Sequence, residues 1–353
     1  MQRRMTVLTI AVGFALLLVS SAAMAQYQLV NLASNQIGKA HHADPLIANA
    51  WGLVHAPGSP WWVSDNTSGW STLYDNTGTA QGLRVLIPTA GNGPSTPTGN
   101  NGPGLPTGIV WNGSNEFQVQ GWASIFLFAT LDGTISGWAF QSNPNQAILA
   151  VDNSSKKSSY TGLAITNKPS GNFLYAADQA NNKVDIYDGN FNFVKSFTDT
   201  SLPAGFAPFG IQDINGIVYV TFAATNGGPG GFVDQFREDG TLINPGTPLI
   251  HGAPLNQPWG ITGAPKGFGP FGNTLLISNN TNFGTINAFD PFTGQFVGTV
   301  KDAKTGKPIV IDQLWGIGFG DGMGANGGIN QLYFTAGPSN NLAGTYGVIA
   351  FKP

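Results

Sequence analysis

Two groups of polar residues in this chain have side chains suited to catalysis or to cation binding. Histidine beside carboxylates can act as a general base or, as neutral imidazole, ligate a metal, so His42, Asp44 and His251 are candidate catalytic residues. Calcium takes several carboxylate and amide oxygens, so residues that end hydrophobic segments are candidate ligands for Ca²⁺ or another divalent cation: Asp65, Asn66, Asp178 and Asn279. Asp and Asn are also common turn residues, and this alternative stays open.

A third group is aromatic and precedes repeated glycines. Flat aromatic faces can stack on a sugar ring or another apolar ligand, and Trp adds a polar handle. We therefore predict a ligand-binding role for Trp51, Phe209, Trp259 and Trp315. The alternative is that these side chains pack as core, with glycine allowing close backbone approach.

The element that must position these residues is a short repeat in which Gly is followed by Leu or Ile. Six copies are present, and their glycines are spaced by 56, 54, 48, 50 and 56 residues: Gly52, Gly108, Gly162, Gly210, Gly260 and Gly316. Such a period is typical of a propeller. Each copy is followed by a β-branched and aromatic run and, in most copies, by a third segment that closes on a turn containing Asp or Gly.

The sequence therefore predicts an all-β fold, a six-bladed β-propeller of four-stranded antiparallel blades. The single propeller domain would span residues 26–353, with blades that start near residues 51, 107, 161, 209, 259 and 315. The last repeat lacks a fourth strand, whereas an unassigned strand, residues 27–32, lies upstream of the first repeat. We expect this N-terminal strand to pair with the last blade, because closure leaves no open edge.

In an up-and-down blade, the connectors that enter the first strand and the turns between the second and third strands share one face, here called the top face. All three groups of candidate residues belong to it. The connector 88–106, which is rich in Gly and Pro, also lies on this face and is expected to be long and flexible. Loops of this kind are either functional lids or linkers.

The N-terminal 25 residues have the composition of an export signal. Arg3 and Arg4 precede an apolar run, and Ala23-Met24-Ala25 resembles a cleavage site, so we predict a signal peptide over residues 1–25 and a periplasmic or extracellular protein. No later stretch reaches the ~18 apolar residues of a membrane span, so no transmembrane segment is expected in the mature chain.

Charge and cysteine content exclude further classes of protein. Without Arg3 and Arg4, the mature chain has 13 basic and 18 acidic residues, a net charge of −5, which argues against nucleic acid as a partner. Cysteine is absent, and this excludes disulfides, thiolate catalysis and cysteine-held metals.

Short motifs along the chain resemble those of an uncharacterised family of exported bacterial, propeller-like proteins. They cover nearly all of the mature chain and include His42-Ala43-Asp44-Pro45, Asn49-Ala50-Trp51-Gly52-Leu53, Pro208-Phe209-Gly210-Ile211-Gln212, Pro258-Trp259-Gly260 and Leu332-Tyr333-Phe334-Thr335-Ala336-Gly337. A looser similarity is to NHL-repeat propellers, which bind proteins, bind RNA or hydrolyse lactones. The resemblance implies an exported repeat protein and does not select an activity.

Two functions remain open from the sequence. The favoured hypothesis is an exported binding propeller whose top face engages a saccharide, a small molecule or a protein partner. The alternative is a divalent-metal-dependent hydrolase or lyase of a small ring substrate, similar to lactonases. The first rests on the aromatic residues and the second on the Asp and Asn residues of the same face.

Overall fold

The computed structural model of this protein describes residues 26–91, 103–166 and 171–352. The predicted signal peptide, residues 1–25, lies outside the described residues, as does the central part of the connector, residues 92–102. The ends of the connector are held together, because Pro88 bridges to Pro103 and the Gly104 N–H donates to the carbonyl of Ile87. Within the described ranges, helical segments are single short turns, and none could span a bilayer.

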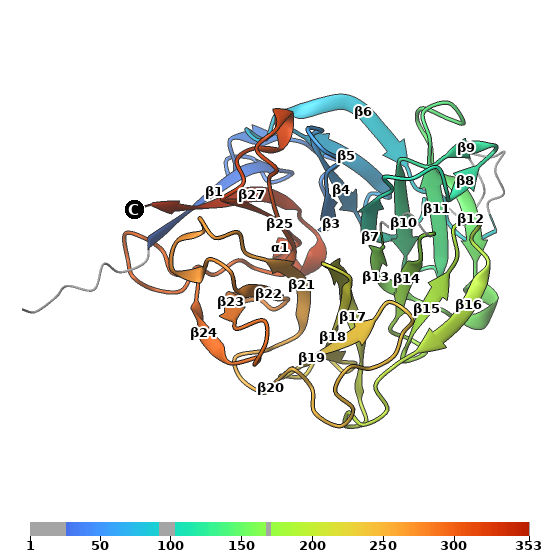
Figure 1. The fold of residues 1–353 in the computed structure, drawn as a ribbon. Helices are drawn as coiled ribbons and strands as arrows, with labels where there is room; N and C mark the ends of the chain where they lie inside the picture. Colours follow the sequence, from blue (N-terminus) through green and yellow to red (C-terminus); the bar gives the residue numbers. More distant parts are fainter. Residues whose placement is uncertain (1–25, 92–102, 167–170, 353) are drawn as a thin grey trace, which may run out of the picture.

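Six four-stranded antiparallel sheets surround a central axis (Figure 1). From the inner to the outer strand, blades 1 to 3 contain β3 (Ala50–Val54), β4 (Trp61–Asp65), β5 (Trp70–Tyr74) and β6 (Ala80–Leu86); β7 (Pro106–Trp111), β10 (Phe126–Thr130), β11 (Thr134–Trp138) and β12 (Ile148–Asp152); and β13 (Tyr160–Ile165), β14 (Leu174–Asp178), β15 (Lys183–Tyr187) and β16 (Phe193–Phe197).

Blades 4 to 6 follow the same order and complete the ring. Their strands are β17 (Phe206–Ile214), β18 (Ile217–Ala224), β19 (Phe232–Arg237) and β20 (Ile250–His251); β21 (Pro258–Gly263), β22 (Leu275–Asn279), β23 (Ile286–Phe289) and β24 (Phe296–Thr299); and β25 (Leu314–Phe319), β26 (Gln331–Ala336), β27 (Thr345–Lys352) and β1 (Gln26–Ser34). The predicted all-β, six-bladed propeller is thus confirmed.

Four shorter elements are added to the blades. Strand β2 (His42–Ala43) pairs in parallel with β1, and β8 (Gln118–Val119) forms a small hairpin with β9 (Trp122–Ala123). The turn α1 (Pro338–Asn341) follows β26 and contains residues with positive φ.

The ring is closed by the N-terminal strand, as predicted. Strand β1 pairs antiparallel with β27 from Gln26 opposite Lys352 to Ser34 opposite Thr345, and Figure 1 shows the two side by side. The buried Tyr27 anchors β1, because its hydroxyl donates to the carbonyl of Phe268 at 2.8 Å and its ring stacks on Phe271. The last blade therefore contains strands from both ends of the chain.

The six repeated glycines lie where each inner strand approaches the next. A Cβ added at any of them would contact the inner strand of the following blade; at Gly316 it would lie 2.9 Å from the Trp51 carbonyl oxygen, which completes the circle. A hydroxyl spans the same junction in blade 5. The Ser278 Oγ accepts from the Gly260 N–H at 2.8 Å and donates to the Trp315 carbonyl at 2.7 Å.

Blades 2 and 3 use a different arrangement at this junction. Their second strands carry Ala129 and Ala177 where blade 5 carries Ser278, and their inner strands carry Thr107 and Thr161 before the glycine. The Thr107 Oγ1 donates to the carbonyl of Tyr160 at 2.6 Å, so the hydroxyl has moved from the second strand to the first. The residue before the repeated glycine is thus Thr in blades 2 and 3, and it is aromatic in the other four blades.

Replacing Gly210 by Ala is expected to lower the free energy of unfolding by about 2 kcal/mol or more, because the added methyl group would overlap the Trp259 carbonyl and overpacking costs on this order. Gly82→Ala is the matched control, since Gly82 lies in the exposed strand β6 with open space around it. Urea denaturation of both variants checks the prediction. Equal stability of the two would contradict a steric role for Gly210.

Candidate functional site

The top end of the channel is filled by an aromatic plug formed by Trp51, Phe209, Trp259 and Trp315. Trp51 stacks on Trp315 with ring centroids 3.6 Å apart and an interplanar angle of 17°, and Trp259 and Phe209 pack edge-on against both. Each ring is only 3–8% exposed. The Trp259 indole N–H donates to Thr161 and that of Trp315 to Asn49.

The structure therefore brings the four predicted aromatic residues together, but as packed core. Their faces contact one another, so they do not form an open platform for a ligand. The predicted role of these four residues in ligand binding stays a prediction, and their packing supports the alternative of a structural core.

Three of the four predicted metal ligands cap loops on the top face. The Asp178 carboxylate accepts from the Ser159 N–H at 3.0 Å, and the side-chain amide oxygen of Asn279 accepts from the Asn256 N–H at 3.1 Å. Asn66 lies between Asn49, from which it accepts, and the Pro106 carbonyl, to which it donates. Their hydrogen bonds fix the connectors that enter the blades.

Asp65, the fourth predicted ligand, is completely buried. Burial raises the pKa of its carboxyl group well above its usual range, and the Thr72 hydroxyl donates to it at 2.6 Å. Among the described residues, no group of three or more His, Asp or Glu could hold a metal. Cation binding by the four predicted ligands, two of which are Asn, stays a prediction.

The candidate catalytic residues also lie apart. His42 is exposed in β2 beside blade 6, whereas His251 is exposed in β20, the outer strand of blade 4. Asp44 is buried, and its carboxylate accepts from the Tyr74 hydroxyl at 3.0 Å and from the Leu46 N–H at 2.9 Å. The Asp44 carboxylate thus fixes a turn, and a shared catalytic role for the three residues stays a prediction.

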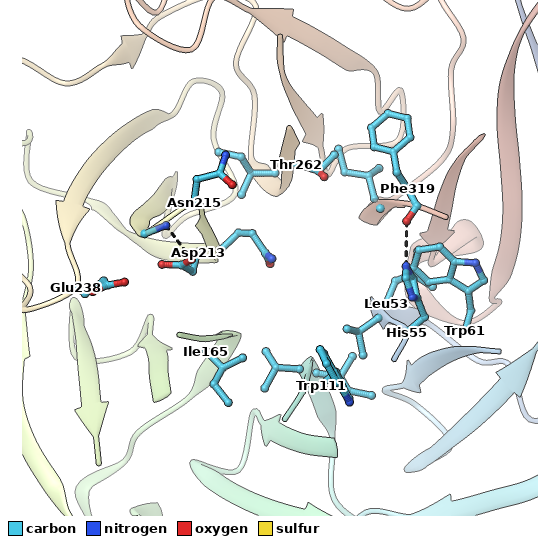
Figure 2. A pocket seen from close by; sticks show the side chains of 18 residues that line it. Leu53, His55, Trp61, Trp111, Ile165, Asp213, Asn215, Glu238, Thr262 and Phe319 are labelled. Atoms are coloured by element: carbon cyan, nitrogen blue, oxygen red, sulfur yellow. Dashed lines mark hydrogen bonds between the residues drawn. The ribbon is translucent and has the colours of Figure 1, made fainter. Parts of the chain in front are cut away.

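A cavity of about 600 Å³ opens at the bottom face, where the inner strands end (Figure 2). All six blades contribute to its wall. The Leu or Ile that follows each repeated glycine lines the inner end of the channel, one from each blade, and we call this set the aliphatic ring: Leu53, Ile109, Leu163, Ile211, Ile261 and Ile317. Toward the plug the channel narrows to a void of about 40 Å³, room for only a few water molecules. The cavity is therefore entered from the bottom face.

Blade 4 forms a polar wall of this cavity, which consists of Gln212, Asp213, Asn215 and Glu238. Strand β17 has nine residues, whereas the other inner strands have five or six. Gln212 and Asp213 lie within β17, at positions that most other inner strands also contain, and Asn215 lies in the turn that follows. The turn after β17 is fixed by the Gly216 N–H, which donates to the Asp213 carboxylate at 3.2 Å. Figure 2 shows Asp213, Asn215 and Glu238 across the cavity from His55 and Trp61.

His55 connects blade 1 to blade 6 at the opposite side of the cavity. Its Nε2 lies 3.0 Å from the Phe319 carbonyl oxygen, and its Nδ1 lies 3.1 Å from the Asn326 amide nitrogen and 3.7 Å from an Asp321 carboxylate oxygen. Its ring packs edge-on against Trp61. Both ring nitrogens thus have protein partners, and the geometry makes His55 a connection between blades.

Sequence reasoning missed this cavity because it assigned function to the top face. The available signals were the Leu or Ile after each repeated glycine and the longer inner strand pair of blade 4. Within the repeat pattern, the segment Gln212–Gly216 has the composition of an ordinary turn.

A buried acid pair lies outside the channel, between blades 3 and 4. Asp199 and Asp234 are 5% and 1% exposed. Burial, together with the negative charge of Asp199 and a hydrogen bond to it, raises the pKa of Asp234 to about 7. Asp234 therefore keeps its proton in mildly acidic solution.

No protein family model matches the chain. An uncharacterized protein of Acanthamoeba polyphaga mimivirus is 28% identical over 348 residues, which cover 93% of this chain and 81% of the relative. A second uncharacterized protein of the same virus is 32% identical over 210 residues, which cover 55% of this chain and 38% of the relative. These relatives are viral, and the predicted likeness to a bacterial exported family stays a prediction.

Several solved structures share the propeller fold. A streptogramin B lyase superimposes with a TM-score of 0.53 at 11% identity, with 94% of this chain and all of that chain covered. A catalytically inactive histidine-to-alanine variant of virginiamycin B lyase from Staphylococcus aureus, with quinupristin, gives 0.53 at 13%, covering 92% and 99%. A Bacteroides thetaiotaomicron protein of unknown function gives 0.54 at 12%, covering 91% and 76%. At these identities the likeness concerns the fold.

Trp259→Ala is expected to lower the free energy of unfolding by about 3–5 kcal/mol, the usual cost of truncating a buried Trp. Trp122→Ala is the control, because Trp122 is 50% exposed and its loss should cost less than about 0.5 kcal/mol. Thermal and urea unfolding measure both. If Trp259→Ala is as stable as the control, Trp259 is not packed core, and the plug is again a candidate binding surface.

Asp234 should make stability fall as pH rises from about 4 to about 7. The unfolded chain loses this proton near pH 4, whereas the folded protein keeps it to about pH 7, so proton release favours unfolding across that window. Asp234→Asn should remove the fall and be about 1–2 kcal/mol more stable than the parent at pH 8. Urea unfolding from pH 4 to 8 tests this, with the exposed Asp239→Asn as a control that keeps the fall.

Proposed function

We propose that this protein is an exported binding propeller that takes a small molecule into the cavity at its bottom face. The observation that carries the proposal is a cavity of about 600 Å³ that is walled by all six blades and backed by the aromatic plug. Small-molecule sites typically have volumes of roughly 300–1,000 Å³, apolar walls and a few convergent polar groups. The proposal moves the site from the predicted top face to the opposite end of the channel.

Export remains part of the proposal and rests on the composition of residues 1–25. N-terminal sequencing of the protein recovered from outside the cytoplasm tests it, and the expected first residue is Gln26. A saccharide or protein partner at the top face also remains a prediction. The aromatic surface of the plug is almost fully covered, and this does not favour stacking of a ligand there.

Binding is favoured over chemistry because the cavity presents no evident catalytic set among the described residues. Both nitrogens of His55 are engaged, and the described residues offer no three-ligand metal group. The alternative of a divalent-metal-dependent hydrolase or lyase stays a prediction, and the structural likeness to streptogramin B lyases supplies only a fold. Elemental analysis of purified protein, followed by melting with and without chelator, tests this alternative.

Thr262→Trp tests the proposed site by filling it, because Thr262 lines the cavity. Compounds from a metabolite library that raise the melting temperature of the parent protein do so by binding the folded state. We expect Thr262→Trp to abolish that shift, and Ala80→Trp, a change on the exposed outer strand β6, to preserve it. Shifts of equal size in Thr262→Trp and the parent would place the ligand elsewhere, and a library without hits would count against a small-molecule function.

A further inference from the structure

We infer that the cavity selects an amphipathic ligand that enters with an apolar group first and carries a cationic group at the blade 4 wall. This inference rests on the proposed function and adds the chemical class and the orientation of the ligand. It depends on how the two kinds of side chain are distributed in the cavity.

The inner end of the cavity is apolar around nearly its whole circumference. The aliphatic ring takes one Leu or Ile from each of the six blades, and its isoleucines are 5–7% exposed. The void beyond it, of about 40 Å³, leaves no space for a polar group with its hydration shell. Because an unpaired polar group is costly in such surroundings, this end accepts an alkyl or aryl group.

The rim of the cavity is asymmetric in charge. The lining carboxylates, Asp213 and Glu238, both belong to blade 4, and the lining residues that the structure describes include no Lys or Arg. Each of these carboxylates also interacts with other groups of the protein, so the inference uses only the sign of their charge. Focused negative potential in a cleft with apolar walls attracts cations and repels anions.

Apart from His55, the uncharged polar side chains of the rim lie on or beside the same wall. Gln212 and Asn215 are exposed amides on blade 4, and Thr262 follows on the adjacent blade 5. Across the cavity stand His55, Trp61 and Phe319, and Trp111 lies beside Ile165 along a third side (Figure 2). A ligand with its head group at blade 4 therefore has mainly aliphatic and aromatic side chains against the rest of its surface.

Three probes with the same indole body separate charge from shape: tryptamine is cationic, tryptophol is neutral and indole-3-acetate is anionic. Ligand-observed NMR titration to millimolar concentration should rank tryptamine above tryptophol by about tenfold and show no binding of indole-3-acetate. With isoleucine methyl groups labelled, the indole protons should give nuclear Overhauser effects to Ile109, Ile261 and Ile317. The tryptamine preference should weaken with added salt.

Variants identify the wall that sets the preference. Asp213→Asn with Glu238→Gln should bring tryptamine to the affinity that tryptophol has for the same variant, whereas Asp239→Asn, next in sequence but outside the lining, should keep the tenfold preference. Melting of each variant confirms that it is folded.

The outcomes distinguish a wrong ligand class or orientation from a wrong binding site. Equal binding of the three probes, binding of indole-3-acetate, or a preference retained in the double variant overturns the cationic class. Overhauser effects that place the ammonium group at the isoleucines overturn the orientation. If no probe binds while Thr262→Trp still blocks a library ligand, the ligand class is wrong and the site stands; if Thr262→Trp has no effect on any ligand, the proposed function itself fails.

Discussion

The contact on which this propeller depends is the one between each repeated glycine and the inner strand of the next blade. Without a side chain at this point, six inner strands come close enough to form one continuous wall, and hydroxyl groups tie them together at the same level. The diameter that results is small enough for four aromatic rings and two threonines to fill the top end. The plug, the narrow void and the aliphatic ring all follow from this spacing, because each is built from residues next to the glycines.

The same glycines explain how much of the fold the sequence could predict. Their period identified six blades, and the unassigned strand at residues 27–32 identified the closure, because both features can be counted along the chain. The location of a site could not be predicted in this way. Whether Trp259 is an open surface for a ligand or part of the core depends on the channel diameter. That diameter is set by the packing of all six blades and cannot be inferred from the sequence of one repeat. Asp178 shows a second limit of prediction from sequence. An Asp that caps a loop and an Asp that binds a metal have the same sequence pattern, and they differ only in whether backbone N–H groups or a cation contact the carboxylate oxygens.

Function in a ring of similar repeats requires that one repeat differ from the others. Here blade 4 differs by carrying amide and carboxylate side chains where the other blades present mostly aliphatic and aromatic ones to the cavity. Changes of this kind, at the ends of strands, leave the glycine contacts untouched. Side-chain changes near the strand ends therefore allow the binding properties of the cavity to vary while the fold stays constant.

Closure of the ring by β1 also has a consequence for biosynthesis. Gln26 pairs with Lys352, so the closing contact joins residues separated by nearly the whole chain, and contacts of such long sequence separation form slowly. A chain emerging from the ribosome holds β1 without a partner until β27 has been made, and unpaired strand edges of this kind promote aggregation. The propeller thus becomes complete only after β27 has been made, and until then β1 is exposed to pairing with other chains.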